Sequence, residues 1–188
     1  ASTNLVHVDG LSHHIWLRNL YAHDAGLDGD VVKVNQCDHV FVEASELARP
    51  GARRRSTDPY QECIDLLDVD DSAIRDCFIH DAGSIALTVK GASRNPIIER
   101  NVIADQRAGA SDPIVALGGV TDKTLLNNEN YEVYNVIFRN NIVQNGVTGA
   151  IGIYDGQRVY VSDNLLVDNS TALIEFRARH GAARQSAA

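Results

Sequence analysis

The sequence has little that would mark a membrane, metal-finger or nucleic-acid-binding protein. No apolar run reaches the roughly 18 residues that a membrane-spanning helix needs. Its three cysteines, Cys37, Cys63 and Cys77, form neither a CxxC pair nor a Cys/His ligand spacing, so we expect small core residues rather than a zinc site. The formal net charge is -8, which argues against a nucleic-acid partner because phosphate contacts need clustered Lys and Arg.

Methionine is absent, and the chain opens on Ala1-Ser2-Thr3-Asn4 without an apolar leader. We therefore expect the sequence to be part of a longer protein. Residues 181–188 have no apolar periodicity and are expected to form a loose tail. Residues 1–180 have the length and composition of one soluble domain, with 44% hydrophobic and 22% charged residues over the whole chain.

Helical periodicity with caps is also missing, and an internal repeat stands in its place. The segment from Arg18 to Gly26 matches the segment from Arg75 to Gly83, and the match continues without a gap to Lys33 and Lys90. The offset is a constant 57 residues. A gapless match of this length indicates repeated structural units.

Shorter repeats fill the intervals, each with a polar pair, two or three apolar residues and an Asp or Asn before a turn. Each unit is typical of two or three short strands separated by Asn, Asp and Gly turns. Asn101, Asn141 and Asn164 stand at equivalent places, where stacked side-chain amides can form a ladder. We interpret them as structural, and His23 and His80 as turn residues.

The repeat length favours a coil over the other repeat folds. Equivalent strand positions are spaced 23 to 37 residues apart, which suits a short coil with insertions in its turns. The sequence lacks the leucine ladder of a leucine-rich repeat and the longer four-stranded period of a propeller blade. We predict an all-β fold, a single-stranded right-handed parallel β-helix (solenoid) of about six to seven coils over residues 1–180, itself part of a longer helix.

Alternation along the strands places certain side chains on the outer surface. Stacking the equivalent positions predicts one outward column: Lys33, Asp65, Lys90, Leu117, Tyr154 and Arg177. Asp30 and Glu62 should lie along its rim, and Glu175 beside Arg177. The segment 66–71 needs one extra residue, a bulge, to keep Asp65 outward. Two insertions, 48–60 with Arg53-Arg54-Arg55 and 121–131, are expected to wall a groove or cap an edge.

The densest acidic stretch contains Glu62, Asp65, Asp68, Asp70 and Asp71. Carboxylates at a strand end and turn offer the oxygen ligands that calcium prefers. The alternative is an acidic turn whose charges pair with lysines of neighbouring coils.

The segment Glu62-Cys63-Ile64-Asp65, followed one coil later by Val89-Lys90-Gly91-Ala92-Ser93-Arg94-Asn95, resembles the parallel β-helix proteins of the pectate-lyase-like superfamily. The resemblance implies a secreted, extracellular or periplasmic protein that cleaves uronate-containing polysaccharide by β-elimination. It implies Ca²⁺ held by Glu62 and Asp65, with Asp68 as a third ligand and Lys90 as the base. Lys33 or Arg177 would hold substrate carboxylates, and Tyr154 would stack on a sugar ring.

One electrostatic condition applies to this chemistry. A lysine beside Asp65 has its pKa raised, so Lys90 acts as a base only if a cation at Asp65 reverses the field. Two other functions stay open. One is a glycoside hydrolase on the same fold, using two or three of the carboxylates at Asp65, Asp68, Asp70 and Asp71. The other is a non-catalytic carbohydrate-binding or structural module.

Overall fold

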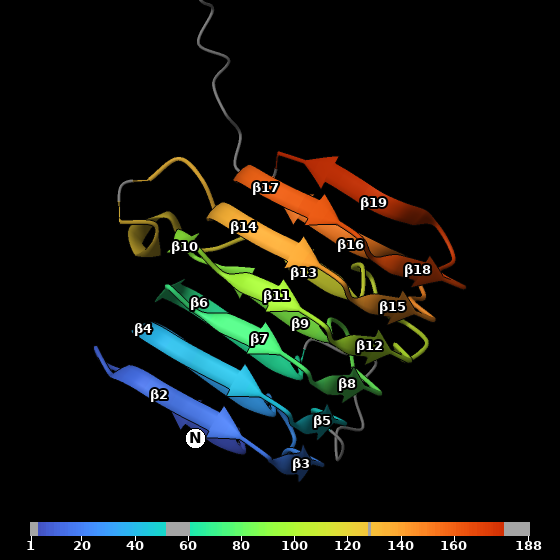
Figure 1. The fold of residues 1–188 in the computed structure, drawn as a ribbon, viewed down its shortest axis with the longest axis horizontal. Helices are drawn as coiled ribbons and strands as arrows, with labels where there is room; N and C mark the ends of the chain where they lie inside the picture. Colours follow the sequence, from blue (N-terminus) through green and yellow to red (C-terminus); the bar gives the residue numbers. More distant parts are fainter. Residues whose placement is uncertain (1–3, 52–60, 128, 179–188) are drawn as a thin grey trace, which may run out of the picture.

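The computed structural model describes residues 4–51, 61–127 and 129–178. Within these ranges short β-strands wind into stacked coils, and every strand pairing is parallel (Figure 1). The only helical segment of the described residues is a 3-10 turn, η1 (Lys123–Leu125). None of the described helical structure is long and apolar enough to cross a membrane.

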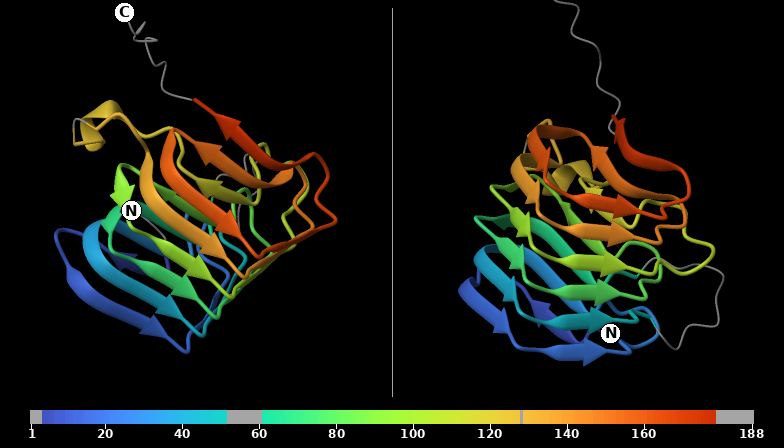
Figure 2. Two further views of the ribbon diagram at one scale, coloured as in Figure 1. Left: turned by 45° about the horizontal axis from the view of Figure 1, so that its top comes forward. Right: turned by 45° about the vertical axis from the view of Figure 1, so that its right-hand side comes forward.

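Each coil contributes to three faces that meet at bends (Figure 2). The first face consists of β1 (Val6–Val8), the start of β4 (Val32–Glu43), β6 (Ile64–Asp70), β9 (Leu87–Lys90), β13 (Val115–Leu117), β16 (Gly149–Tyr154) and β19 (Ala172–Arg177). The second face consists of β2 (His13–Arg18), the end of β4, β7 (Ala73–Arg75), β11 (Ile97–Glu99), β14 (Val133–Arg139) and β17 (Gly156–Ser162). The corner between these two faces carries the short strand β10 (Ser93–Arg94).

The third face is a separate 6-stranded sheet, whereas the first and second faces merge into one 13-stranded sheet through strands that bend at the corner. It consists of β3 (Tyr21–His23), β5 (Glu46–Ala48), β8 (Phe78–His80), β12 (Val102–Ala104), β15 (Ile142–Gln144) and β18 (Leu165–Val167). The chain is thus an all-β parallel helix, as the repeats predict.

Single residues in the left-handed backbone conformation turn the chain at its corners. Asn19, Asp76 and Asn140 occupy one corner of the first, third and fifth coils with φ of 55°, 57° and 55°. Asn and Asp are the non-glycine residues that adopt this conformation most readily, which explains the repeated Asn and Asp before each turn. Within 66–71 the alternation is interrupted at Asp68, whose φ is 55°, but Gln36 opposite it in β4 has φ of 53°, so β6 carries no extra residue relative to β4 and the predicted bulge is absent from this pairing.

Alternating side chains build the core. Ile64 and Leu66 are fully buried inside the coil, and Asp65 between them points to the outer side of the first face. All three cysteines are free and buried, as expected. The predicted amide ladder is confirmed: Asn101 Nδ2 donates to Asn141 Oδ1 at 3.0 Å, and Asn141 Nδ2 donates to Asn164 Oδ1 at 3.1 Å.

The 57-residue repeat predicts the strand register correctly on the third face, whereas its prediction for the first face is wrong. Tyr21 pairs with Glu46 and Glu46 with Phe78, so residues 57 apart occupy one position two coils apart. On the first face Lys33 pairs with Asp65, but Asp65 pairs with Thr88 instead of Lys90. The cause is the turn before β9, which is two residues shorter than the turn before β4.

The predicted outward column therefore divides into two rows. The first outward row is Lys33, Asp65, Thr88, Ala116, Gly152 and Glu175. The second outward row includes Leu67, Lys90, Tyr154 and Arg177. Leu117 belongs to neither row: it pairs with Val89 and Ile153 and is buried in the core, so its predicted place is wrong.

The insertion predicted at 121–131 packs against the coils. The carboxylate of buried Glu132 accepts hydrogen bonds from the backbone N–H groups of Gly91 and Thr121, both at 2.8 Å. Leu126 joins Ala92 in a small apolar cluster beside it. Two other predictions lie outside the described residues, namely the Arg53–Arg55 triplet and the loose tail at 181–188.

Candidate functional site

Two lysines and a buried carboxylate form the centre of a charged cluster on the first face. The side chain of Asp65 is 2% exposed and those of Lys33 and Lys90 are 21% and 20% exposed. Both lysines contact Asp65 Oδ2: Lys33 Nζ donates to it in a short contact, and Lys90 Nζ lies 3.1 Å away. Lys90 reaches this oxygen from the second outward row, two residues beyond the strand position opposite Asp65.

Two further carboxyl groups stand beside Asp65. Asp30 and Glu62 directly precede the strands of successive coils, and the backbone N–H of Glu62 donates to Asp30 Oδ1 at 2.9 Å. Asp30, Glu62 and Asp65 each offer one oxygen, and these oxygens lie within 4.8 Å of one another. Lys33 Nζ is also 3.8 Å from Asp30 Oδ2. We call Asp30, Lys33, Glu62, Asp65 and Lys90 the acid–lysine cluster.

Crowding and burial shift the protonation of the cluster. Burial, followed by the charge of Asp65, raises the pKa of Glu62 well above its ordinary value, and burial also raises the pKa of Asp30. Burial by itself lowers the pKa of Lys90, but the charges of Asp65 and Glu62 outweigh it, so the pKa of Lys90 is raised. Lys90 is therefore a cation while only these side chains surround it, in agreement with the electrostatic condition derived from the sequence.

Unpaired polar atoms lie at the same place. Asp65 Oδ1 and its strand neighbour Thr88 Oγ1 are both buried and have no hydrogen-bond partner among the residues that the structure describes. A buried polar atom without a partner costs about 1–3 kcal/mol, and a bound ion or ligand is one of the ways in which native proteins satisfy such an atom.

The carboxyl trio fits a calcium ion. Calcium–oxygen distances of about 2.3–2.6 Å allow two ligands of one ion to lie up to about 5 Å apart. The three oxygens of Asp30, Glu62 and Asp65 meet this limit, and Asp65 Oδ1 is available as a further ligand. The separation of these oxygens is shorter than the distance of roughly 6.5–9.5 Å between the two carboxyl groups of an inverting glycosidase.

Asp68, the third metal ligand expected from the sequence, does not join this trio. Its carboxylate accepts from Asn127 Nδ2 at 3.1 Å and lines a pocket at the corner between the first and second faces. Asp70 and Asp71 line the same pocket. The reason is local: the left-handed conformation of Asp68 turns the chain at the corner and carries its side chain away from Asp65.

The expected substrate-binding residues Tyr154 and Arg177 lie at the other end of the first face. Tyr154 is 1% exposed and its hydroxyl lies 2.5 Å from Glu175 Oε1, so its ring has no open face for a sugar. Arg177 is exposed and its Nη2 lies 2.9 Å from Glu175 Oε2. Three strand spacings, about 14 Å, separate Arg177 from Lys90 along the second outward row.

Sequence reasoning placed Asp30 on the rim but left it out of the metal ligands, and it overlooked Thr88. The signal for Asp30 was present, since it precedes Lys33 by the same three residues that separate Glu62 from Asp65. Thr88 could not be found in this way, because the gapless repeat aligns Asp65 with Lys90 and does not show the two-residue shift of β9 that places Thr88 opposite Asp65. We call this shift the two-residue slip.

With this geometry in place, the relationships of the chain can be stated. Residues 6–182 match the family described as "Right handed beta helix region". The chain belongs to this right-handed β-helix family. No curated protein matches its sequence significantly.

Among solved structures, this β-helix is similar to the A-module of the mannuronan C-5 epimerase AlgE4 from Azotobacter vinelandii, with a TM-score of 0.56 and 17% sequence identity. The similarity covers 89% of this chain but only 57% of that module. At this identity the likeness concerns the fold alone.

Proposed function

We propose that this β-helix binds uronate-containing polysaccharide across the outward rows of its first face and removes the proton at C5 of a bound uronate unit. The observation that carries the proposal is the acid–lysine cluster, in which two lysines meet one buried carboxylate that keeps an unpaired oxygen. A similar fold acts as a mannuronan C-5 epimerase, which supports a uronate polymer as the substrate class. Such a substrate belongs outside the cytoplasm, so we also propose a secreted, extracellular or periplasmic protein.

The proton at C5 is acidic only when the neighbouring carboxylate is neutralised, because the charge of the enolate must be stabilised. We assign Ca²⁺ to Asp30, Glu62 and Asp65, where it would neutralise the substrate carboxylate and offset the negative field that holds the proton on Lys90. Lys90 then accepts the C5 proton at Nζ. Carboxylates of the polymer are held by Lys33, which lies in the same cluster as Lys90, and by Arg177 at the far end of the face.

The anion formed at C5 has two fates. Loss of the group at C4 gives β-elimination and an unsaturated chain end, whereas return of a proton to the opposite side gives epimerisation. We propose β-elimination as the reaction. The C-5 epimerase with a similar fold favours epimerisation as the second candidate.

The test incubates the protein with polymannuronate, mixed alginate and polygalacturonate in D₂O, with calcium and then with a chelator. Ultraviolet absorbance of the unsaturated product reports elimination, and deuterium at C5 of intact polymer reports epimerisation. Either signal, lost on chelation, supports C5 proton removal. New reducing ends without unsaturation would indicate a glycoside hydrolase instead, and binding without any product would indicate a non-catalytic module.

Variants connect the activity to the cluster. We expect Lys90→Ala to abolish product formation with both polymer binding and fold retained, because it removes the base while Lys33 still pairs with Asp65. Lys123→Ala, at a lysine of η1 in the exposed part of the insertion, is the matched control and keeps full activity. Full activity in Lys90→Ala would exclude its role as the base.

A further inference from the structure

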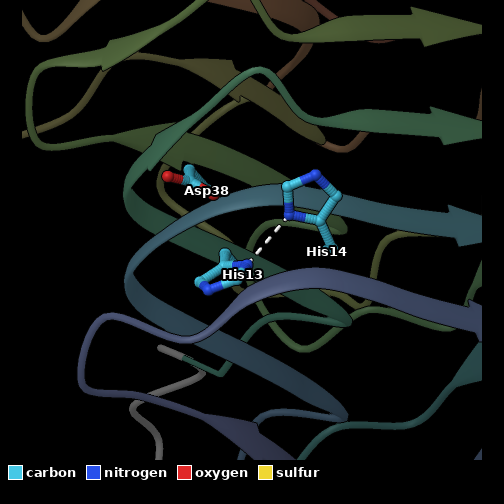
Figure 3. A group of neighbouring side chains, drawn as sticks. All are labelled: His13, His14 and Asp38. Atoms are coloured by element: carbon cyan, nitrogen blue, oxygen red, sulfur yellow. Dashed lines mark hydrogen bonds between the residues drawn. The ribbon is translucent and has the colours of Figure 1, made fainter.

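A second group of metal-ligating side chains lies beside the corner pocket, in the first two coils, and one of its members, Asp38, lines that pocket. His13 and His14 begin β2, and Asp38 and His39 lie in β4. His13 is the strand partner of Asp38, which places His14 opposite His39. Figure 3 shows His13, His14 and Asp38 gathered on the outside of the corner. All three are exposed, and none belongs to the acid–lysine cluster.

The ligand atoms of these three residues are close enough to share one ion. His13 Nδ1 lies 2.9 Å from His14 Nδ1, and the two nitrogens with a carboxylate oxygen of Asp38 lie within 4.8 Å of one another. Two imidazole nitrogens on a tetrahedral ion with metal–nitrogen bonds of 2.0–2.1 Å stand about 3.3 Å apart. An opening of a few tenths of an ångström therefore converts the observed pair into a pair of ligands.

His39 supports two of these ligands without being one of them. Its ring stacks on that of His14, with centroids 4.5 Å apart and planes 4° apart, and its Nδ1 lies 3.1 Å from Asp38 Oδ1. Such contacts to the neighbours of a metal fix the orientation of its ligands. They leave the second oxygen of Asp38 for an ion.

Stacking at the corner alone does not account for this arrangement. The same corner position is held in later coils by Asn95 and Asn135, which share a 2.8 Å amide hydrogen bond and have φ of 56° and 55°. His14 and His39 have φ of 56° and 51° and stack in the same way. A ladder needs only these two histidines, so the convergence of His13 and Asp38 on His14 is an additional feature.

We propose that His13, His14 and Asp38 bind a divalent first-row transition cation of the Zn²⁺ class, which joins the first coil to the second. Two imidazoles and one carboxylate leave a coordination position open for water, and imidazole nitrogen selects such ions over calcium or magnesium. Because His13 and His14 come from β2 and Asp38 from β4, the ion ties together two coils that otherwise share only strand hydrogen bonds and packing here.

The test measures zinc binding by calorimetry on chelator-treated protein, with Co²⁺ as a spectroscopic probe. We expect one saturable zinc site and a visible Co²⁺ absorption of low coordination number. The His14→Asn and Asp38→Asn variants should weaken binding by about tenfold or more. Asn is the residue at this corner in two later coils, at Asn95 and Asn135, so His14→Asn keeps the backbone conformation and the fold.

His23→Asn is the matched control, because His23 also pairs with a neighbouring aspartate, Asp24, but lies outside the proposed zinc site. It should leave zinc binding unchanged. Zinc should also slow amide hydrogen exchange in β2 of the wild type and not in His14→Asn. The proposal is overturned if wild type and His14→Asn bind zinc equally, if Co²⁺ keeps the spectrum of the hydrated ion, or if calcium competes on equal terms.

Discussion

Replacing Asp65 by Asn removes the charge that holds the acid–lysine cluster together while keeping the shape of the side chain. At an effective dielectric constant of about 20, a contact of 3.1 Å such as that of Lys90 with Asp65 is worth about 5 kcal/mol before desolvation. Desolvation of the buried carboxylate offsets most of this attraction. Water also screens Lys33 and Lys90, which keep 21% and 20% of their side chains exposed. We expect a net loss of about 2 kcal/mol, below the roughly 3–5 kcal/mol that breaking a fully buried ion pair costs, because both lysines are partly exposed.

The assay is urea unfolding of wild type and Asp65→Asn side by side, without calcium. Asp76→Asn is the control, because Asp76 forms an equally short pair with Arg100, at 2.8 Å and 2.9 Å, in an exposed position. Exposed pairs contribute little, so this variant should unfold near the wild-type midpoint. Calcium at about 100 times its dissociation constant should add about 2.7 kcal/mol to the wild type and nothing to Asp65→Asn. A variant as stable as wild type without calcium, or one that calcium still stabilises, would refute the account of the cluster.

Two further predictions follow from buried groups of the coil. Asn101→Ala leaves the Cys77 N–H and the Ile74 carbonyl without the partners they have at 3.0 Å, and should cost about 3 kcal/mol in unfolding free energy. Asn164→Ala, at the half-buried end of the same ladder where water can replace part of the amide's hydrogen bonding, should cost about 1 kcal/mol; equal losses in the two variants would contradict the buried ladder. The raised pKa of Glu62 means that the folded protein keeps a proton that the unfolded chain releases, so without calcium its stability should fall as pH rises above the ordinary Glu value of 4.5. Glu62→Gln should flatten this fall in urea midpoints measured across pH, and an unchanged slope would exclude Glu62 as its source.

The fold could be predicted because its causes are local and repeated. Residues with left-handed backbone at each corner favour Asn and Asp, and residues that stack in the ladder are Asn, so both leave a periodic trace in the sequence. The candidate site could be predicted only in part. Its outward side chains followed from alternation, and Lys33 opposite Asp65 followed from the repeat.

The remainder depended on turn geometry that periodicity does not encode. Asp68 has a left-handed backbone conformation, which interrupts the alternation of its strand and directs its side chain away from Asp65. The histidines at 13, 14 and 39 gave no repeated spacing, because they come together only through the pairing of β2 with β4. Contacts of this kind are set by register, and register between coils changes with every turn length.

The two-residue slip itself can be tested by cross-linking, since a slip of two keeps every side chain on its own face and alters only its partner. Leu67→Cys combined with Lys90→Cys places two thiols at paired positions with Cα atoms about 4.8 Å apart, within the range for a disulfide. Asp65→Cys combined with Lys90→Cys, the pairing expected from the gapless repeat, separates the Cα atoms by about 8 Å, beyond that range. The native cysteines are buried, and burial raises the pKa of the Cys63 thiol, so mild oxidation should spare them. Mass spectrometry of linked peptides should find the first disulfide and not the second; the reverse result would restore Lys90 to the position opposite Asp65 and remove Thr88 from the site.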